Sequence, residues 1–193
     1  KERADHMLSI ADDKLQDIYL PKKENFKNYI KRIPMGVSFI IAPWNYPYLT
    51  SVNSIIPSLA AGNSVILKHS AQTPLCAEQL YESAKKTLPK NIFNYLHLNH
   101  NDSLKIVSDK RIGFVSFTGS VNAGYEVQKA TMNKFISIAL ELGGKDPAYV
   151  RHDANLENTV ENLVDGSFFN SGQSCCGIER IYVDKKIYND FIE

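Results

Sequence analysis

Residues 37–47 read Val37-Ser38-Phe39-Ile40-Ile41-Ala42-Pro43-Trp44-Asn45-Tyr46-Pro47, and this stretch carries the clearest local signal of the fold class. Its apolar first half predicts a strand that is buried on both faces, as in a parallel sheet. The two prolines make the following loop rigid, because the ring restricts φ. A helix is expected next, to about Ala61, with Gly62 placed to end it. The stretch therefore predicts one strand–loop–helix unit of an α/β sheet.

The same alternation continues along the chain. Further strands are expected at 65–67, 92–96, 114–117 and 135–140, and further helices at 74–88, 103–108 and 121–130. Alternating buried strands and helices indicate an α/β protein with a doubly wound, Rossmann-like open sheet. This pattern predicts the fold class without reference to any motif.

The two ends of the chain carry different patterns. Residues 1–20 are predicted to form an amphipathic helix, whose apolar face is Leu8, Ala11, Leu15 and Ile18. After Gly143-Gly144 the alternation restarts, with a strand at 148–150, a helix at 155–169 and a strand at 181–183. We therefore expect one domain at 1–142 and the beginning of a second α/β domain at 143–193.

Composition excludes several classes of protein. The chain has 193 residues, of which 44% are hydrophobic and 22% charged, with a formal net charge of +1. A near-neutral balance gives no reason to expect a nucleic-acid partner, and no apolar run approaches the roughly 20 residues that span a bilayer. Three cysteines, two of them adjacent, favour a reducing compartment, so a cytoplasmic location is expected. No metal site is expected, since no His or Cys lies at ligand spacing around Cys175.

Two segments carry a thiol and a carboxylate in settings of small residues. Cys175 lies in Gly172-Gln173-Ser174-Cys175-Cys176-Gly177, and Glu141 lies in Glu141-Leu142-Gly143-Gly144-Lys145. A thiolate is a nucleophile and a carboxylate can act as a general base, so the pair suits an enzyme that forms a thioester. Each has a plainer alternative, a buried structural cysteine or a surface glutamate at the end of a strand. We interpret Cys176 as a neighbour of the nucleophile.

Polar residues follow other predicted strands. The amide of Asn45, held between two prolines, could donate to an oxyanion, although Asn is also common in turns. Lys68 ends a predicted strand and could bind ribose hydroxyls or phosphate, with a solvated cation as the alternative. Gly119-Ser120 opens a predicted helix, where free N–H groups bind pyrophosphate. The usual G-x-G-x-x-G fingerprint is absent, so this last signal is weak by itself.

The order of these segments and their residues together resemble the aldehyde dehydrogenase superfamily, from about Tyr29 to Glu193. The segments that carry the resemblance are Pro43-Trp44-Asn45-Tyr46-Pro47, Leu67-Lys68-His69-Ser70-Ala71-Gln72-Thr73-Pro74, Phe117-Thr118-Gly119-Ser120, Glu141-Leu142-Gly143-Gly144-Lys145 and Gly172-Gln173-Ser174-Cys175. The resemblance implies NAD(P)-dependent oxidation of a small aldehyde to a carboxylic acid. It also implies that residues 1–142 belong to a cofactor-binding domain and that 143–193 begin a catalytic domain.

The resemblance implies roles for individual residues. Cys175 matches the catalytic nucleophile, Glu141 the general base and Asn45 the side-chain donor of the oxyanion hole. Positions that match the cofactor-binding residues are Trp44, Lys68, Ser70, Ala71, Gly119, Ser120 and Leu142. Tyr46 and Phe169 match aromatic residues that line the aldehyde tunnel in many members. The presence of Glu141 favours hydrolysis of the thioester over transfer to coenzyme A.

The chain departs from the family pattern at a few positions. Where members often carry Pro and then Glu after the lysine, this chain has His69 and Ala71. That Glu selects an unphosphorylated ribose, so we expect no strict preference for NAD over NADP, with Lys68 and His69 able to tolerate a 2′-phosphate. Asn91 replaces a glycine common in the family's Pro-x-Gly-x-x-Asn loop. Asn53-Ser54 offers no basic residue in the helix after Asn45, which disfavours an acidic substrate.

Family members are much longer than 193 residues, so this chain is expected to be a central piece, and full-length members are usually homo-oligomers. One alternative is a truncated or split product that lacks activity unless a complementary chain joins it. Another is a cysteine hydrolase that pairs Cys175 with a histidine. No His lies in a comparable motif, and the cofactor set around Trp44, Lys68 and Ser120 would then have no role.

Overall fold

The computed structural model describes residues 1–193. The chain divides into two compact units, Lys1–Glu141 and Leu142–Glu193, which are described separately.

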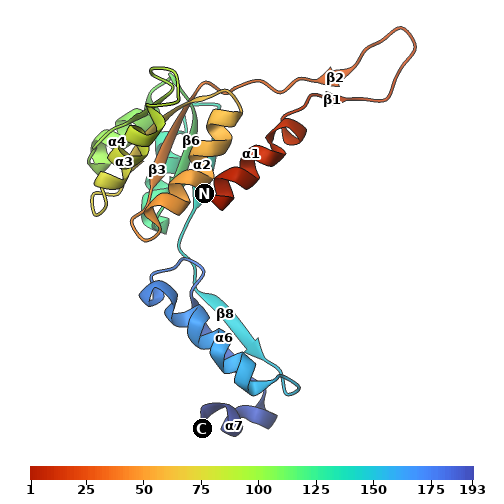
Figure 1. The fold of residues 1–193 in the computed structure, drawn as a ribbon, viewed down its shortest axis with the longest axis vertical. Coiled ribbons are helices and arrows are strands. Elements are labelled where there is room, and N and C mark those ends of the chain that lie inside the picture. The colour runs from red at the N-terminus through yellow and green to blue at the C-terminus, as the bar shows by residue number, and fades with distance from the viewer. The chain divides into compact units, whose positions relative to one another are not determined.

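The first unit is built on a five-stranded parallel sheet (Figure 1). Its strands are β3 (Val37–Ala42), β4 (Ser64–His69), β5 (Phe93–Tyr95), β6 (Ile112–Thr118) and β7 (Ser137–Glu141), in the order β5-β4-β3-β6-β7. Every central residue of β3 from Phe39 to Ala42 is buried, as a strand covered on both faces requires.

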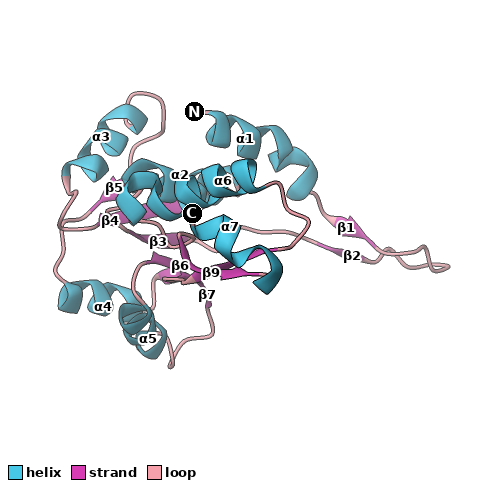
Figure 2. Ribbon diagram, turned by 90° about the horizontal axis from the view of Figure 1, so that it is seen from below, coloured by secondary structure: helices cyan, strands magenta, loops and turns pink.

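Helices cover both faces of this sheet. They are α2 (Pro47–Ala60), α3 (Leu75–Ala84), α4 (His100–Ser108) and α5 (Val121–Ala130). Figure 2 shows α2 and α3 on one side of the strands and α4 and α5 on the other. The predicted α/β class with a doubly wound open sheet is confirmed.

The core under α2 and α3 follows from the alternation of side chains along the strands. Ile40 and Ala42 of β3 and Val65 and Leu67 of β4 pack there against Ile55 of α2. Gly62 ends α2 as the sequence predicts: its φ is +82° and its N–H donates to the Leu59 carbonyl. Helix α4 begins earlier than expected, because Asn99 caps it by accepting from the Asp102 N–H at 2.8 Å.

The chain order creates a reversal in the middle of the sheet. From β3 the chain moves outward through β4 to β5, and it then returns to β6 on the other side of β3. The carboxyl ends of β3 and β6 therefore flank the topological switch point, which is where open α/β sheets bind ligands. The loop 43–46 follows β3 at this edge, and Gly119-Ser120 follows β6.

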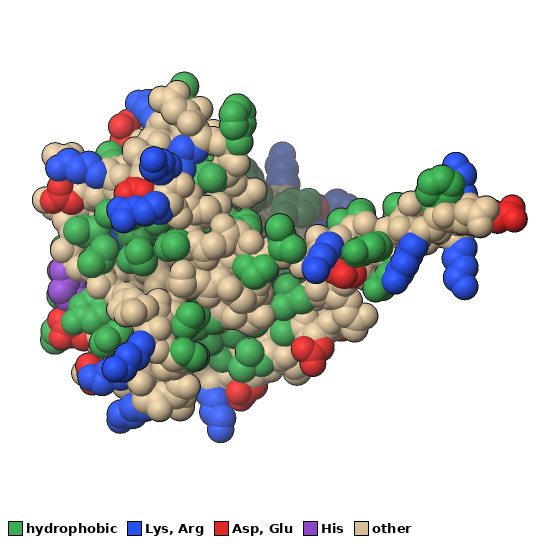
Figure 3. All heavy atoms as spheres, turned by 90° about the horizontal axis from the view of Figure 1, so that it is seen from above, with side chains coloured by type: hydrophobic (Ala, Val, Ile, Leu, Met, Phe, Trp, Pro, Cys, Tyr) green, Lys and Arg blue, Asp and Glu red, His purple; other side chains and the backbone are tan.

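The prediction of a helix near the N-terminus is confirmed, but its extension to Leu20 is wrong. Helix α1 spans Glu2–Lys14 and packs beside α2, and none of its residues is buried. Ile18 instead lies in β1 (Ile18–Tyr19), which pairs antiparallel with β2 (Tyr29–Ile30). The helical spacing of apolar residues extends through Ile18, but pairing with Ile30, twelve residues away, overrides it. Figure 3 shows hydrophobic and basic side chains side by side along this hairpin arm.

The second unit is a smaller β-α-β element. Strands β8 (Asp146–Val150) and β9 (Ile178–Val183) pair in parallel, and α6 (Leu156–Phe168) connects them. A 3₁₀ turn, η1 (Phe169–Gly172), follows α6, while η2 (Lys185–Ile187) and α7 (Tyr188–Ile192) follow β9. Val150 and Leu163 are its buried apolar residues.

Candidate active site

The loop after β3 carries the predicted oxyanion donor at the switch point. Asn45 and Tyr46 are half-buried there, and Trp44 is exposed. Tyr46 is the N-cap residue of α2, and Pro47 occupies the first turn, where its missing N–H costs nothing. The Asn45 amide is therefore attached to the start of a helix whose apolar face is anchored in the core.

Lys68 lies inside the end of β4, paired in register with Ile41 of β3. Its exposed fraction is only 5%, so the alternative of a solvated surface cation is wrong. Burial lowers the pKa of Lys68, because a low-dielectric setting disfavours the charged form. Its ammonium has no hydrogen-bond or ion-pair partner in the protein. A largely buried donor without a protein partner suits the hydroxyls of a bound ribose.

His69 is buried on the opposite face of β4, toward α2. Its Nε2 atom lies 3.0 Å from the Pro47 carbonyl oxygen, and its Nδ1 atom lies 3.0 Å from the Thr73 hydroxyl. Burial lowers the pKa of His69, and the charge of Lys68 lowers it further, although the hydrogen bond to Pro47 raises it. Both ring nitrogens are occupied within the protein, so His69 itself offers no free nitrogen to a 2′-phosphate.

The turn after β4 carries two further predicted cofactor positions. The Ser70 hydroxyl accepts from the Gln72 N–H at 3.2 Å, which holds the turn in shape. Ala71 is exposed. This position therefore carries no carboxylate that would repel a 2′-phosphate.

Gly119 and Ser120 join β6 to α5 and are tightly constrained. A Cβ on Gly119 would lie 2.7 Å from the Phe117 ring, so any larger residue would force that ring to move. The Gly119 N–H donates to the Glu141 carbonyl at 3.0 Å, and the Ser120 hydroxyl caps α5 by accepting from the Ala123 N–H. The first turn of α5 leaves backbone N–H groups without intrahelical partners, which favours an anion there.

Glu141 is the last residue of β7, paired with Thr118 of β6, and it is exposed. The sequence prediction that it stands at the carboxyl end of a strand is confirmed. Leu142, the next residue, is half-buried and belongs to the second unit.

Cys175 lies in the turn before β9 of the second unit, exposed and without a hydrogen-bond partner for its Sγ atom. The adjacent Cys176 is also exposed, but its Sγ atom lies 3.2 Å from the Ser174 hydroxyl. Gly144 approaches the Cys175 backbone closely: a Cβ there would lie 2.3 Å from the Cys175 carbonyl oxygen. Two motifs that are separate in sequence thus meet inside this unit.

Three successive residues before Cys175 have left-handed backbone conformations. The φ angles are +52° at Asn170, +59° at Ser171 and +71° at Gly172. This conformation costs roughly 1–2 kcal/mol for a residue with a Cβ, and such strain concentrates at functional sites. Phe169 begins the same turn and is exposed. Sequence reasoning missed this strained run, since Asn170-Ser171 reads as an ordinary loop.

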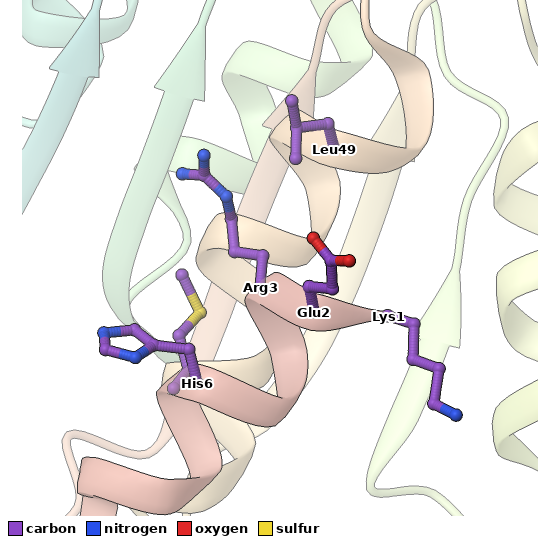
Figure 4. A pocket seen from close by; sticks show the side chains of 6 residues that line it. Lys1, Glu2, Arg3, His6 and Leu49 are labelled. Carbon is purple, nitrogen blue, oxygen red and sulfur yellow. The ribbon is translucent and has the colours of Figure 1, made fainter.

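A groove of about 700 Å³ lies between α1 and the start of α2, lined by Lys1, Glu2, Arg3, His6, Met7 and Leu49 (Figure 4). The Arg3 guanidinium extends from α1 and donates to the Asn53 side-chain oxygen at 3.3 Å. The helix after Asn45 carries no basic residue of its own, as the sequence indicates, but α1 places the Arg3 guanidinium beside it. Only tertiary packing supplies this group, so no local pattern could have revealed it.

Comparison with protein families matches residues 3–193 to the aldehyde dehydrogenase family. The chain belongs to the aldehyde dehydrogenase family. It is 35% identical over 164 residues to a D-glyceraldehyde dehydrogenase (NADP(+)) of Picrophilus torridus, which covers 84% of this chain and 33% of that protein. It is 36% identical to a betaine aldehyde dehydrogenase of Agrobacterium fabrum, over 95% of this chain and 37% of the relative.

The solved structure of PnpE in complex with nicotinamide adenine dinucleotide is similar to this chain, at 33% identity and a TM-score of 0.89, over 95% of this chain and 38% of that one. The chain spans between 33% and 38% of the length of the curated relatives it matches. None of its helices combines the length and apolar character that crossing a membrane requires.

Proposed function

We propose that this chain carries the site of an NAD(P)-dependent aldehyde dehydrogenase that oxidises a small aldehyde to a carboxylic acid. The observation that supports it most is the grouping of the Asn45 loop and the N-terminus of α5 at the switch point of the sheet, with Lys68 at the end of the adjacent strand, in a chain that belongs to this family. In this proposal residues 1–142 form a cofactor-binding domain and 143–193 begin the catalytic domain.

The first unit has the features that a dinucleotide requires. Lys68 offers an ammonium group without a protein partner for the ribose, and the first turn of α5 offers N–H groups for the pyrophosphate, with Gly119 allowing the close turn. Trp44, Ser70 and Ala71 are the remaining proposed contacts in this unit, and Leu142, which begins the second unit, is proposed as a further one. When bound, the nicotinamide would accept a hydride from the substrate.

Both forms of the cofactor are compatible with this site. The named relatives include an NADP(+) enzyme, and a solved neighbour is a complex with nicotinamide adenine dinucleotide. Ala71 presents no carboxylate that would repel a 2′-phosphate, so we propose that either dinucleotide is used.

The protein residues would carry out the remaining chemistry. The Cys175 thiolate adds to the aldehyde carbon, and the Asn45 amide and the Cys175 N–H stabilise the oxyanion that forms. Loss of hydride from this adduct leaves a thioester on Cys175. Glu141 takes a proton from water, the water oxygen adds to the thioester carbon, and the thiolate leaves with formation of the carboxylic acid. Tyr46 and Phe169 are proposed to line the path of the aldehyde.

The test uses the full-length protein with Glu141→Gln, and Glu126→Gln as the control, since Glu126 is an exposed carboxylate of α5. Glu141→Gln should give a single burst of reduced cofactor and then almost no turnover, because the thioester forms but is not hydrolysed. Glu126→Gln should turn over normally. Steady turnover in Glu141→Gln would remove this residue from the mechanism, and no aldehyde-dependent reduction in the unsubstituted protein would overturn the proposed function.

A further inference from the structure

The buried imidazole of His69 connects the end of β4 to the start of α2. Pro47, whose carbonyl it contacts, is two residues after Asn45. A carbonyl oxygen only accepts, so Nε2 carries the proton, and Nδ1 of the neutral ring accepts from the Thr73 hydroxyl. The ring therefore has a defined tautomer, and the Thr73 hydroxyl holds it in place.

A second group also donates to the Pro47 carbonyl. The Ser51 hydroxyl lies 2.7 Å from this oxygen, but Ser51 belongs to α2 itself. Its hydrogen bond therefore stabilises the helix without attaching it to the sheet. Of these two side-chain donors, only His69 joins the Pro47 carbonyl to a strand.

One other side-chain hydrogen bond attaches α2 to the sheet. The Ser54 hydroxyl of α2 lies 2.8 Å from the Ser116 hydroxyl of β6. Ser54 is two turns further along the helix than Pro47, so this contact holds the middle of α2. The two contacts differ in position relative to Asn45, and that difference allows their roles to be separated.

We propose that His69 is the positioning residue that holds the Asn45 amide in place for oxyanion stabilisation, through its hydrogen bond to the Pro47 carbonyl. The inference rests on the proposed role of Asn45. His69 touches neither substrate nor cofactor and acts through the backbone of the loop. An oxyanion donor works only when it is held near its hydrogen-bonding distance, and a shift of about 1 Å in a reacting group can lower a rate on the order of a hundredfold.

Two substitutions test the contacts of the two ring nitrogens of His69 one at a time. The amide nitrogen of Gln reaches the place of Nε2, so His69→Gln keeps a donor for the Pro47 carbonyl. The shorter Asn reaches only the place of Nδ1, so His69→Asn keeps the contact with Thr73 and loses the one with Pro47. Ser54→Ala is the matched control, because it removes the other attachment of α2.

The readout is acylation of Cys175 by para-nitrophenyl acetate in the full-length protein without cofactor. The thiolate adds to the ester carbon, the same oxyanion forms, and nitrophenolate leaves as the thioester appears, so no hydride acceptor is involved. His69→Asn should lower the acylation rate about ten- to a hundredfold, while His69→Gln and Ser54→Ala should stay within about threefold of the unsubstituted protein.

A double-mutant cycle with Asn45→Ala decides whether His69 acts through Asn45. In the Asn45→Ala background, His69→Asn should have almost no further effect on acylation. Equal losses in both backgrounds, or equal losses in His69→Asn and Ser54→Ala, would overturn the proposal and leave His69 as a packing residue only. If His69→Asn does not fold, Thr73→Val takes its place in the cycle with the same criteria, since it releases the ring from its fixed orientation.

The proposed function has its own test, which does not depend on the result of the double-mutant cycle. Aldehyde-dependent cofactor reduction in the unsubstituted protein tests that function by itself. A protein that oxidises aldehydes but shows additive effects of His69→Asn and Asn45→Ala would keep the proposed function and refute this inference. A protein that oxidises no aldehyde would fail the earlier test whatever the result of the cycle.

Discussion

Replacing Gly144 with Ala should slow the reaction of Cys175 with electrophiles about a hundredfold. The added Cβ would lie 2.3 Å from the Cys175 carbonyl oxygen, 3.2 Å from the Asp146 carboxylate and 3.5 Å from the Cys175 carbonyl carbon. Two of these three atoms belong to the backbone of Cys175. The clash is therefore with the nucleophile's own main chain and not with the end of a flexible side chain.

The magnitude follows from the displacement that relieves the clash. An ordinary contact begins near 3.4 Å, so the Cys175 carbonyl must move away by about 1 Å. A shift of this size in a reacting group can lower a rate on the order of a hundredfold. Overpacking of this kind typically also costs about 1–3 kcal/mol of stability. The adjacent Gly143→Ala is the matched control, since nothing lies within 4 Å of its added Cβ and neither glycine has a positive φ.

The assay measures the rate of Cys175 alkylation by iodoacetamide and the pre-steady-state burst of reduced cofactor in the full-length protein. Gly144→Ala should lower both rates about a hundredfold, whereas Gly143→Ala should change neither by more than a few-fold. A Gly144→Ala protein that reacts at the unsubstituted rate would refute the reasoning. Equal losses in the two variants would show that flexibility of the segment, and not the close contact with Cys175, is what matters.

Three further results are expected from the full-length protein. Iodoacetamide should modify Cys175 before Cys176, whose Sγ atom contacts a hydroxyl, and adduct mapping that finds only Cys176 would contradict the assignment. The kcat/KM values for NAD and NADP should lie within about tenfold of each other, or ~1.4 kcal/mol. Ala71→Glu should shift the preference toward NAD. An unchanged ratio in this variant would exclude position 71 from cofactor selection. The free energy of unfolding should fall as pH drops below about 6.5, because burial lowers the pKa of His69 and the unfolded chain then takes up a proton that the folded chain does not. Denaturant titrations at pH 7.5 and 5.5 should show that His69→Gln reduces this dependence, and an equal slope in both proteins would assign it to other groups.

The periodicity of the sequence was sufficient to predict the architecture of the first unit. Buried strands such as 37–42 are short and apolar throughout, and loops and glycines separate them from amphipathic helices. These signals are local, because they depend on side-chain spacing within one element. The same holds for the end of α2 at Gly62, where only a residue tolerant of positive φ fits easily. The motifs around Asn45, Glu141 and Cys175 were likewise visible from residue order alone.

Contacts between residues that are distant in sequence determined the features that periodicity and motifs did not predict. Pairing with β2 ended α1 at Lys14, although the helical spacing of apolar residues continues to Ile18. His69 is buried and contacts the carbonyl of Pro47, 22 residues earlier in the chain, so it links β4 to α2. The guanidinium of Arg3 reaches Asn53 across 50 positions. None of these contacts can be predicted from the spacing of residues within one element. Each joins two segments that are distant in sequence, and these segments come together only when the chain folds.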